Sequence, residues 1–265
     1  MDKNGDTDGM NESGSNQVKN NFCFFWLSKS PGFFLALSLR KNGNMKVFYG
    51  SKKDEKALIN REKFFKEIGA PGEKVVSVKS VHGDNIVIVT EKDCGKFIDG
   101  ADGLITGCRD VYLSITIADC LPVIIFSIEK PAISLLHCGW KCLEKGIIGK
   151  SVLRIKHSFN IDPDNLYAGI GPGIGKCHYE VGVDFQEKFM AYPDAFLQRR
   201  GRIFADIKSI AQKQLEDAGV KLENIDTSPV CTYCEADRYF SHRKDKSEPV
   251  KAMIAVAGIR CDSTC

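Results

Sequence analysis

The stretch VYLSITIADCLPVIIFSIEKPAISLLHCGWKCLEKGIIGKSVLRIKHSF, residues 111–159, determines the fold class. Its first half holds three apolar segments of strand length, at Val111–Ile117, Val123–Ile128 and Pro131–Leu136. Its second half changes to a helical period, so one amphipathic helix is expected from Leu143 to Phe159. Buried strands followed by an amphipathic helix predict a layered α/β domain.

The same alternation of strands and helices continues on both sides of this stretch. Further strands are expected at Phe22–Leu27, Phe33–Leu39, Lys74–Ser80, Ile86–Val89, Asn165–Ile170 and Ala252–Ile259. Helices are expected at Asp54–Ile68 and Asp206–Ala218, each followed by a glycine, and a tight turn is expected at His82–Asn85. Since no linker separates these elements, residues 21–265 are predicted to form a single layered α/β domain, with mixed sheets flanked by helices. The polar residues 1–20 are expected to be a disordered tail.

Composition excludes several classes of protein. Hydrophobic residues make up 43% and charged residues 27% of the 265 residues, an ordinary globular balance. The net charge of +3, without a long Lys/Arg run, argues against a nucleic-acid partner. No apolar run approaches the roughly 20 residues that span a membrane. The eleven cysteines are an odd number and follow no signal-peptide pattern, so free thiols in the cytoplasm are expected rather than a secreted disulfide scaffold.

Three short segments place a potential metal ligand at the end of a predicted strand. They are VHG at 81–83, ADCLP at 118–122 and HCGW at 137–140. Strand ends in layered α/β proteins converge on binding crevices, and two imidazoles with one thiolate suit a borderline-soft divalent ion. His82, Cys120 and His137 would leave a fourth position for water, the pattern of catalytic zinc. The spacing itself matches no local zinc motif, so a structural His and an inert buried Cys remain the alternative from the residues alone.

Seven motifs in a fixed order strengthen the metal hypothesis. They are VHGD (81–84), GADGLIT (100–106), ADCLPV (118–123), HCGWK (137–141), GIGPGI (169–174), CTYC (231–234) and YFSHRKD (239–245). Together they resemble the laccase-domain family of YfiH-like, or polyphenol oxidase-like, purine nucleoside phosphorylases, over about residues 22–260. The resemblance implies a YfiH-like fold and one zinc ion per chain at His82, Cys120 and His137. Copper is not expected, since five histidines are too few for a multicopper oxidase.

The resemblance also implies an activity. Adenosine, inosine and methylthioadenosine would be split by phosphate into base and (methylthio)ribose 1-phosphate, and adenosine would also be deaminated to inosine. The partners would be purine nucleosides and phosphate, and the protein would be a cytoplasmic monomer or homodimer. Candidate catalytic residues are Cys120, His137, Asp119 and Asp102. Candidate substrate or phosphate ligands are Arg40, Lys141, Gly171, Gly173 and Arg243.

Two of these phosphate ligands are argued from local structure. The Gly169–Gly175 run could be a backbone cradle for phosphate or simply a tight loop after a strand. Lys141 directly precedes the helix expected at Leu143, and a cation beside a helix N-terminus favours an anion. We therefore expect Lys141 to bind phosphate near the zinc.

Several positions depart from the family's pattern and leave two other functions open. Ser80, Cys138, Lys141, Cys142 and His242 replace the Gln, Ala, Arg, Gly and Tyr that are common there. One alternative is a metal-independent hydrolase or deamidase in which Cys120 attacks and His137 acts as base. The other is a non-catalytic nucleoside-binding protein.

The remaining chemistry-bearing residues are expected to be structural. Cys231 and Cys234 form a C-x-x-C pair, and two unreactive thiols at a turn are favoured because no second pair has suitable spacing. His178, after Cys177, is expected to be structural or exposed. Phe185, Phe189 and Met190 are expected in the core.

Overall fold

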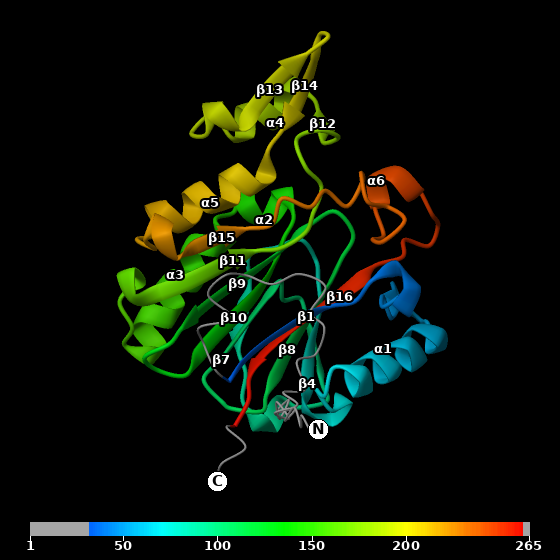
Figure 1. Ribbon diagram of the computed structural model, residues 1–265, viewed down its shortest axis with the longest axis vertical. Helices are drawn as coiled ribbons and strands as arrows, with labels where there is room; N and C mark the ends of the chain where they lie inside the picture. The colour runs from blue at the N-terminus through cyan, green and yellow to red at the C-terminus, as the bar shows by residue number, and fades with distance from the viewer. Residues whose placement is uncertain (1–31, 262–265) are drawn as a thin grey trace, which may run out of the picture.

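The computed structural model describes residues 32–261, which form two sheets packed face to face with helices on both outer sides (Figure 1). The mixed α/β layering expected from residues 111–159 is therefore present. The strand expected at Phe22–Leu27 and the tail at residues 1–20 lie outside the described residues. No helix of residues 32–261 is long and apolar enough to cross a membrane.

The first sheet has five strands and the second has six. The first runs β1 (Phe33–Leu37), β16 (Met253–Ile259), β8 (Tyr112–Ile117), β4 (Val75–Lys79) and β6 (Phe97–Asp99). The second runs β15 (Ile225–Thr227), β11 (Leu166–Ile170), β9 (Leu121–Ser127), β10 (Ala132–Cys138), β7 (Gly103–Thr106) and β5 (Ile86–Ile88). Both sheets are mixed. In the first, β8 runs parallel to β4 and antiparallel to β16. In the second, β9 and β10 are antiparallel, whereas β5 and β7 are parallel.

The central strand β9 shows why the apolar run after Cys120 is continuous. Ile124 and Phe126 point into the core between the two sheets, whereas Val123 and Ile125 point into the core under the helices. A strand covered on both faces has no solvent side and therefore needs apolar residues at every position.

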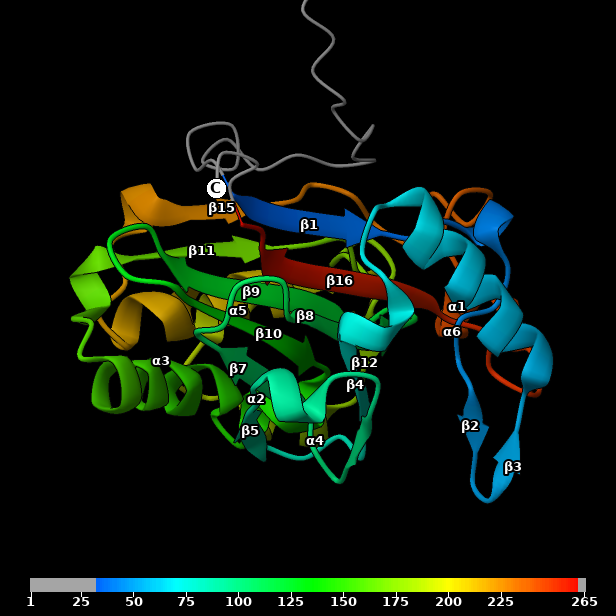
Figure 2. The same cartoon turned by 90° about the horizontal axis from the view of Figure 1, so that it is seen from below.

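Helices cover the outer face of each sheet (Figure 2). On the six-stranded sheet lie α2 (Trp140–Glu144), α3 (Ile147–Phe159) and α5 (Ile207–Asp217). On the five-stranded sheet lies α1 (Glu55–Glu67), which buries Phe64 and Phe65 against strand residues such as Phe34. The side chains of Asp54 and Asp206 accept backbone N–H groups at the starts of α1 and α5, as N-caps do.

Smaller elements project from this body. The strands β12 (Glu180–Val181), β14 (Arg202–Ala205) and β13 (Phe196–Arg199) form a small sheet beside α4 (Val183–Lys188), at the top of Figure 1. A short hairpin joins β2 (Phe48–Tyr49) to β3 (Lys52–Lys53), and α6 (His242–Asp245) precedes β16. Turns of 3-10 helix lie at Arg40–Asn42, Gly72–Lys74, Glu91–Asp93, Pro163–Asn165, Pro193–Ala195 and Leu222–Asn224.

Three expectations from the sequence were wrong. The helix expected from Leu143 to Phe159 is two helices, because Gly146 has a φ of +72° and interrupts the α-helical hydrogen bonding. The turn at His82–Asn85 does not close a hairpin, since β4 and β5 lie in different sheets. Met190 is 75% exposed rather than in the core, because it follows the end of α4 on the projecting sheet, whereas Phe185 and Phe189 are buried.

Candidate functional site

The three expected metal ligands meet where the chain crosses between the two sheets. His82 follows β4 and Cys120 lies between β8 and β9, and both links join strands of different sheets. His137 is near the end of β10, where its register partner is Pro122, so it lies beside the Cys120 link. The ligand atoms of His82, Cys120 and His137 all lie within 4.8 Å of one another. The structure thus brings together three residues that are far apart in the sequence.

Asp102 holds two of these residues in place. Its side chain is completely buried and accepts backbone N–H groups from Val81 (3.1 Å), His82 (3.1 Å) and Gly83 (2.6 Å). These bonds stabilise the loop in which His82 has a φ of +57°, a left-handed conformation that costs a non-glycine residue about 1–3 kcal/mol. Asp102 also accepts from Nδ1 of His137 at 2.8 Å.

The bond between Asp102 and His137 sets the tautomer of the imidazole. Burial raises the pKa of Asp102, but hydrogen bonds from His137 and from the Gly83 backbone outweigh it, so the pKa lies below its usual value. A carboxylate can only accept, and Nδ1 of His137 therefore carries the proton. Nε2 is left as the nitrogen that can bind a metal or a proton.

Cys120 and His137 are electrostatically paired. Burial raises the pKa of the Cys120 thiol, but the charge and the hydrogen bond of His137 outweigh it and lower the pKa to about 6. Burial lowers the pKa of His137, but the Cys120 charge and the Asp102 carboxylate together hold it well above its usual value. At neutral pH Cys120 is therefore a thiolate, which is the form that binds metals and attacks electrophiles.

The space around the triad suits a metal ion. Two nitrogen donors and one sulfur donor are ligands that Zn²⁺ prefers, and Asp102 supplies the outer hydrogen bond that usually orients a ligating His. A Cβ added at Gly139 would lie 2.9 Å from Sγ of Cys120 and 3.3 Å from Cδ2 of His82. Glycine at this position therefore keeps the triad open, and the residues fit a zinc ion.

The triad forms part of the wall of a cavity of about 370 Å³. Four cationic side chains also line it: Lys46, Arg61, Lys79 and Arg243. Asp119 is the only carboxylate among its described lining residues. Aromatic surface comes from Phe48, Phe97, Trp140 and Tyr179. The cavity therefore combines a metal-type triad, positive charge and flat apolar surface.

Most of these lining residues were missed by sequence reasoning. Arg61 lies on α1, is 4% exposed, and donates to the Met45 carbonyl (2.7 Å) and to Oγ of Ser77 (3.1 Å). Burial lowers its pKa to about 9, so it remains protonated at neutral pH. An Arg on the buried face of an amphipathic helix was a possible signal. The aromatic residues Phe48 and Phe97 gave none, because only the packing of distant elements brings them to the cavity.

Asp119 and Arg243, both expected site residues, are connected. The Asp119 carboxylate accepts the Thr232 hydroxyl at 2.6 Å and the Arg243 backbone N–H at 2.7 Å. The Arg243 guanidinium donates to the Glu180 carbonyl at 2.8 Å and lies 5.1 Å from the centre of the Tyr179 ring. Asp119 thus acts as a positioning residue that holds Arg243 at the cavity.

The structure does not bring two expected phosphate ligands to this cavity. Arg40 forms an ion pair with Asp245 (2.6 Å) and donates to the Tyr239 carbonyl, which anchors α6. Lys141 lies inside α2, which already begins at Trp140, and its ammonium is 5.5 Å from the Trp140 ring. Neither residue lines the cavity.

Gly171 and Gly173 serve close packing in this structure. A Cβ at Gly171 would lie 2.6 Å from Cγ of Pro122, and one at Gly173 would lie 2.5 Å from Cδ2 of Leu121. These glycines let the loop after β11 approach the start of β9. Of this loop, Ile174 reaches the cavity.

A family model described as "Multi-copper polyphenol oxidoreductase laccase" matches residues 41–259. The chain belongs to this family. It is 32% identical over 246 residues to "Purine nucleoside phosphorylase YlmD" of Geobacillus stearothermophilus, covering 88% of this chain and 86% of that protein. It is 31% identical over 192 residues to "Purine nucleoside phosphorylase YfiH" of Shigella flexneri, covering 71% and 75%. The crystal structure of YlmD from Geobacillus stearothermophilus superposes with a TM-score of 0.82 at 29% identity, over 87% of this chain and 93% of that one. The YfiH-like fold that the seven motifs implied is confirmed.

Proposed function

We propose that this family member is a zinc-dependent purine nucleoside enzyme, acting in the cytoplasm as a monomer or homodimer. Phosphate would attack C1′ of adenosine, inosine or methylthioadenosine, and the bond from C1′ to the purine nitrogen would break. The products are the protonated base and (methylthio)ribose 1-phosphate. Water would also replace the 6-amino group of adenosine, giving inosine and ammonia. The cavity carries the proposal, because it joins the triad to a cationic lining.

The metal in this proposal is one zinc ion held by His82, Cys120 and His137. When bound there, zinc supplies a Lewis acid that can activate water or polarise a substrate oxygen. Asp102 keeps Nδ1 of His137 protonated, which leaves Nε2 as the nitrogen that would bind the zinc ion. The buried Asp102 carboxylate has four N–H donors, so its role is to orient ligands rather than to transfer protons.

The cationic lining supports phosphate as co-substrate. A guanidinium has five N–H donors in a planar fork that matches phosphate oxygens, and the Glu180 carbonyl takes one donor of Arg243. The Asp119 carboxylate accepts the backbone N–H of Arg243 and so holds Arg243 at the cavity. We therefore assign phosphate to Arg243 in place of Arg40 and Lys141, which lie outside the lining.

The aromatic lining supports a purine. Phe48, Phe97, Trp140 and Tyr179 present flat apolar surface within one cavity, and purines stack on such rings. Burial raises the pKa of the Tyr179 hydroxyl, so it stays protonated and can donate a hydrogen bond to the nucleoside.

The direct test is to incubate the protein with adenosine and phosphate and to separate the products by chromatography. Adenine with ribose 1-phosphate, and inosine, are expected. Both should disappear in Cys120→Ser and persist in Cys94→Ser, whose thiol lies outside the cavity. Binding of inosine without any product would instead identify a non-catalytic nucleoside-binding protein.

The low pKa of Cys120 favours a second candidate, a metal-independent Cys–His hydrolase or deamidase. In that mechanism the Cys120 thiolate attacks an acyl carbon and His137 carries the proton. An alkylating reagent separates the two functions. A zinc-bound thiolate should react only after chelation, whereas a bare nucleophile should react at once, with or without chelator.

A further inference from the structure

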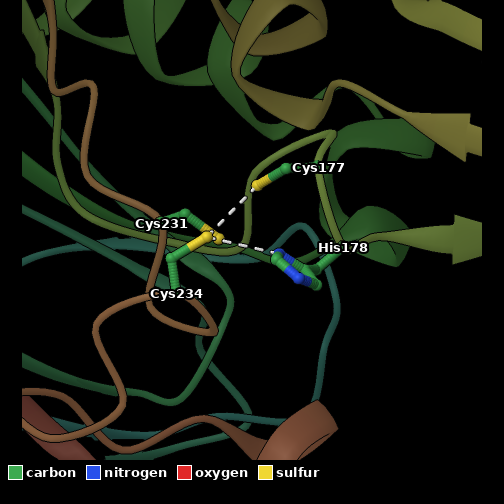
Figure 3. Close-up of side chains that lie close together, drawn as sticks. All are labelled: Cys177, His178, Cys231 and Cys234. Atoms are coloured by element: carbon green, nitrogen blue, oxygen red, sulfur yellow. Dashed lines mark hydrogen bonds between the residues drawn. The ribbon is translucent and has the colours of Figure 1, made fainter.

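Four further metal-type ligands meet outside the cavity (Figure 3). Cys177 and His178 follow the glycine-rich loop after β11, and Cys231 and Cys234 lie in the loop after β15. Their ligand atoms all lie within 4.8 Å of one another, and the four side chains point toward one another. The C-x-x-C pair therefore has partners after all, from a Cys-His dipeptide that matches no paired-cysteine motif.

Two distances between these ligand atoms are close to those of a tetrahedral zinc site. Sγ of Cys177 lies 3.6 Å from Sγ of Cys234, and that sulfur lies 3.3 Å from Nδ1 of His178. With Zn–S near 2.3 Å and Zn–N near 2.0–2.1 Å, ligand atoms in a tetrahedral zinc site are roughly 3.5–3.8 Å apart. A disulfide would need sulfurs about 2.05 Å apart and would give no role to His178.

We propose that Cys177, His178, Cys231 and Cys234 bind a second, structural zinc ion. Four protein ligands close the coordination sphere, unlike the three of the triad, and a closed Cys₃His set is a structural pattern. The inference rests on these four residues alone and is independent of the triad and of the proposed function.

The surrounding backbone is already arranged for a thiolate. The Gly175 N–H donates to Sγ of Cys231 at 3.2 Å. A Cβ at Gly175 would lie 3.3 Å from both Sγ of Cys177 and Cβ of Cys231, so glycine lets the two loops approach. Gly173 and Cys231 also form a β-bridge between the loops.

Charge around the cluster complements such a centre. Three thiolates, a neutral imidazole and Zn²⁺ sum to −1. Three cations bind carbonyls of the ligand loops: Arg199 that of Cys177 (3.1 Å), Lys244 that of Tyr233 (3.2 Å) and Lys208 those of Ser228 and Val230 (both 2.6 Å). Lys208 is largely buried, and burying its ammonium group has a desolvation cost. A nearby anionic metal centre would offset that cost.

Both ligand loops also carry residues of the cavity. Tyr179 directly follows His178 and lines the cavity, while Thr232 directly follows Cys231 and donates to Asp119. A zinc ion here would fasten the two loops together and so fix one wall of the cavity.

Zinc analysis of protein purified with reductant and without chelator tests the proposal. Wild type is expected to hold two zinc ions per chain. Cys234→Ser and Cys177→Ser should each hold one zinc ion. Cys94→Ser, which changes no ligand, should keep two. His178→Cys replaces one ligand by another and should also keep two. Because Cys234 is exposed, its substitution disturbs the core least.

The Cys120→Ser variant separates this inference from the triad. It should retain one zinc ion, and adding Cys234→Ser should remove that ion. The proposal is overturned if Cys120→Ser holds no zinc, if Cys234→Ser loses none relative to wild type, or if mass spectrometry finds a Cys177–Cys234 disulfide in the reduced, zinc-supplied protein.

Discussion

Asp102 connects the two histidines of the triad through one buried carboxylate. It accepts from the His82 backbone and from the His137 ring, so both ligands depend on it. We expect Asp102→Asn to lower zinc affinity at the triad about 10- to 100-fold, the usual effect of losing an outer-shell partner. Competition with a chelator measures this affinity.

The matched control is Asp162→Asn, which changes a carboxylate in an exposed ion pair with Lys156. Asp162→Asn should leave zinc affinity unchanged. If Asp102→Asn also leaves it unchanged, the carboxylate supports only the fold and not the ligands.

The lowered pKa of Cys120 predicts a pH dependence. In chelator-treated protein the thiol is neutral below about pH 6 and becomes a thiolate above it, so alkylation of Cys120 should rise with pH and level off above a midpoint near 6. Cys94, whose pKa is raised by burial, should begin to react only at much higher pH. Mass spectrometry of labelled peptides distinguishes the two.

The lowered pKa of Cys120 also makes the stability of the metal-free protein depend on pH. The thiolate of Cys120 is stabilised in the fold, so its contribution is present above the pKa of the unfolded thiol and is lost as pH falls through about 6. His137→Gln should move the alkylation midpoint upward, because the imidazolium lowers the Cys120 pKa. A midpoint near that of an ordinary thiol in wild type would contradict the pairing.

Substitutions of Arg243 and Lys141 are expected to affect the use of phosphate differently. Arg243→Ala should raise the phosphate KM of phosphorolysis at least about tenfold, the loss of a charge-assisted bond worth roughly 1.5–3 kcal/mol. Deamination should change less, because it uses water. Lys141→Ala should leave both activities intact, since its ammonium lies outside the cavity lining. Steady-state kinetics for both reactions decide, and a selective effect of Lys141→Ala would restore the helix-start hypothesis.

At the scale of elements, the break between α2 and α3 depends on one glycine. Gly146 has a φ of +72°, so Gly146→Ala should destabilise the protein by about 1 kcal/mol. Gly149 lies within α3, and a Cβ there meets no atom within 4 Å. Gly149→Ala should therefore stabilise the protein by about 0.5–1 kcal/mol. Urea unfolding of both variants measures the pair, and equal shifts would show that backbone conformation is not the cause.

The same glycine shows which elements could be predicted. The helical period and the glycines that follow, Gly69 and Gly219, placed α1 and α5 within a residue or two of their observed ends. The helical period runs unbroken through Gly146, however, and only its left-handed φ ends α2. Likewise, β4 and β5 have the pattern of a hairpin, and the separation into two sheets depends on partners distant in sequence.

At the scale of the molecule, the sequence predicted the triad but not the cavity around it. His82, Cys120 and His137 stand beside turn-forming residues at strand ends, and strand ends converge. Arg61 and Phe97 carry no such signal, because they reach the cavity only through the packing of α1 and β6. The Cys177–His178 pair was missed because its partners come from the other loop.

Both proposed metal sites join segments that are distant in sequence, so zinc should stabilise the whole fold. The triad takes two ligands from links between the two sheets and the third from β10, and the Cys₃His cluster would fasten two loops. Free zinc at 100 times its Kd adds about 2.7 kcal/mol for one site. At roughly 2–4 °C per kcal/mol for a chain of this size, chelation should lower the Tm by about 5–10 °C for each site.

Thermal melts with and without chelator, on wild type and two variants, test this coupling. The chelator should lower the Tm of wild type most, that of Cys120→Ser by about half as much, and that of Cys120→Ser with Cys234→Ser hardly at all. The graded loss follows because each substitution removes one ion before the chelator is added. A shift in the double variant equal to that of wild type would mean that the stabilising metal is held elsewhere. A full-sized shift in Cys120→Ser would place all of the metal's stabilisation at the Cys₃His cluster and none at the junction of the two sheets.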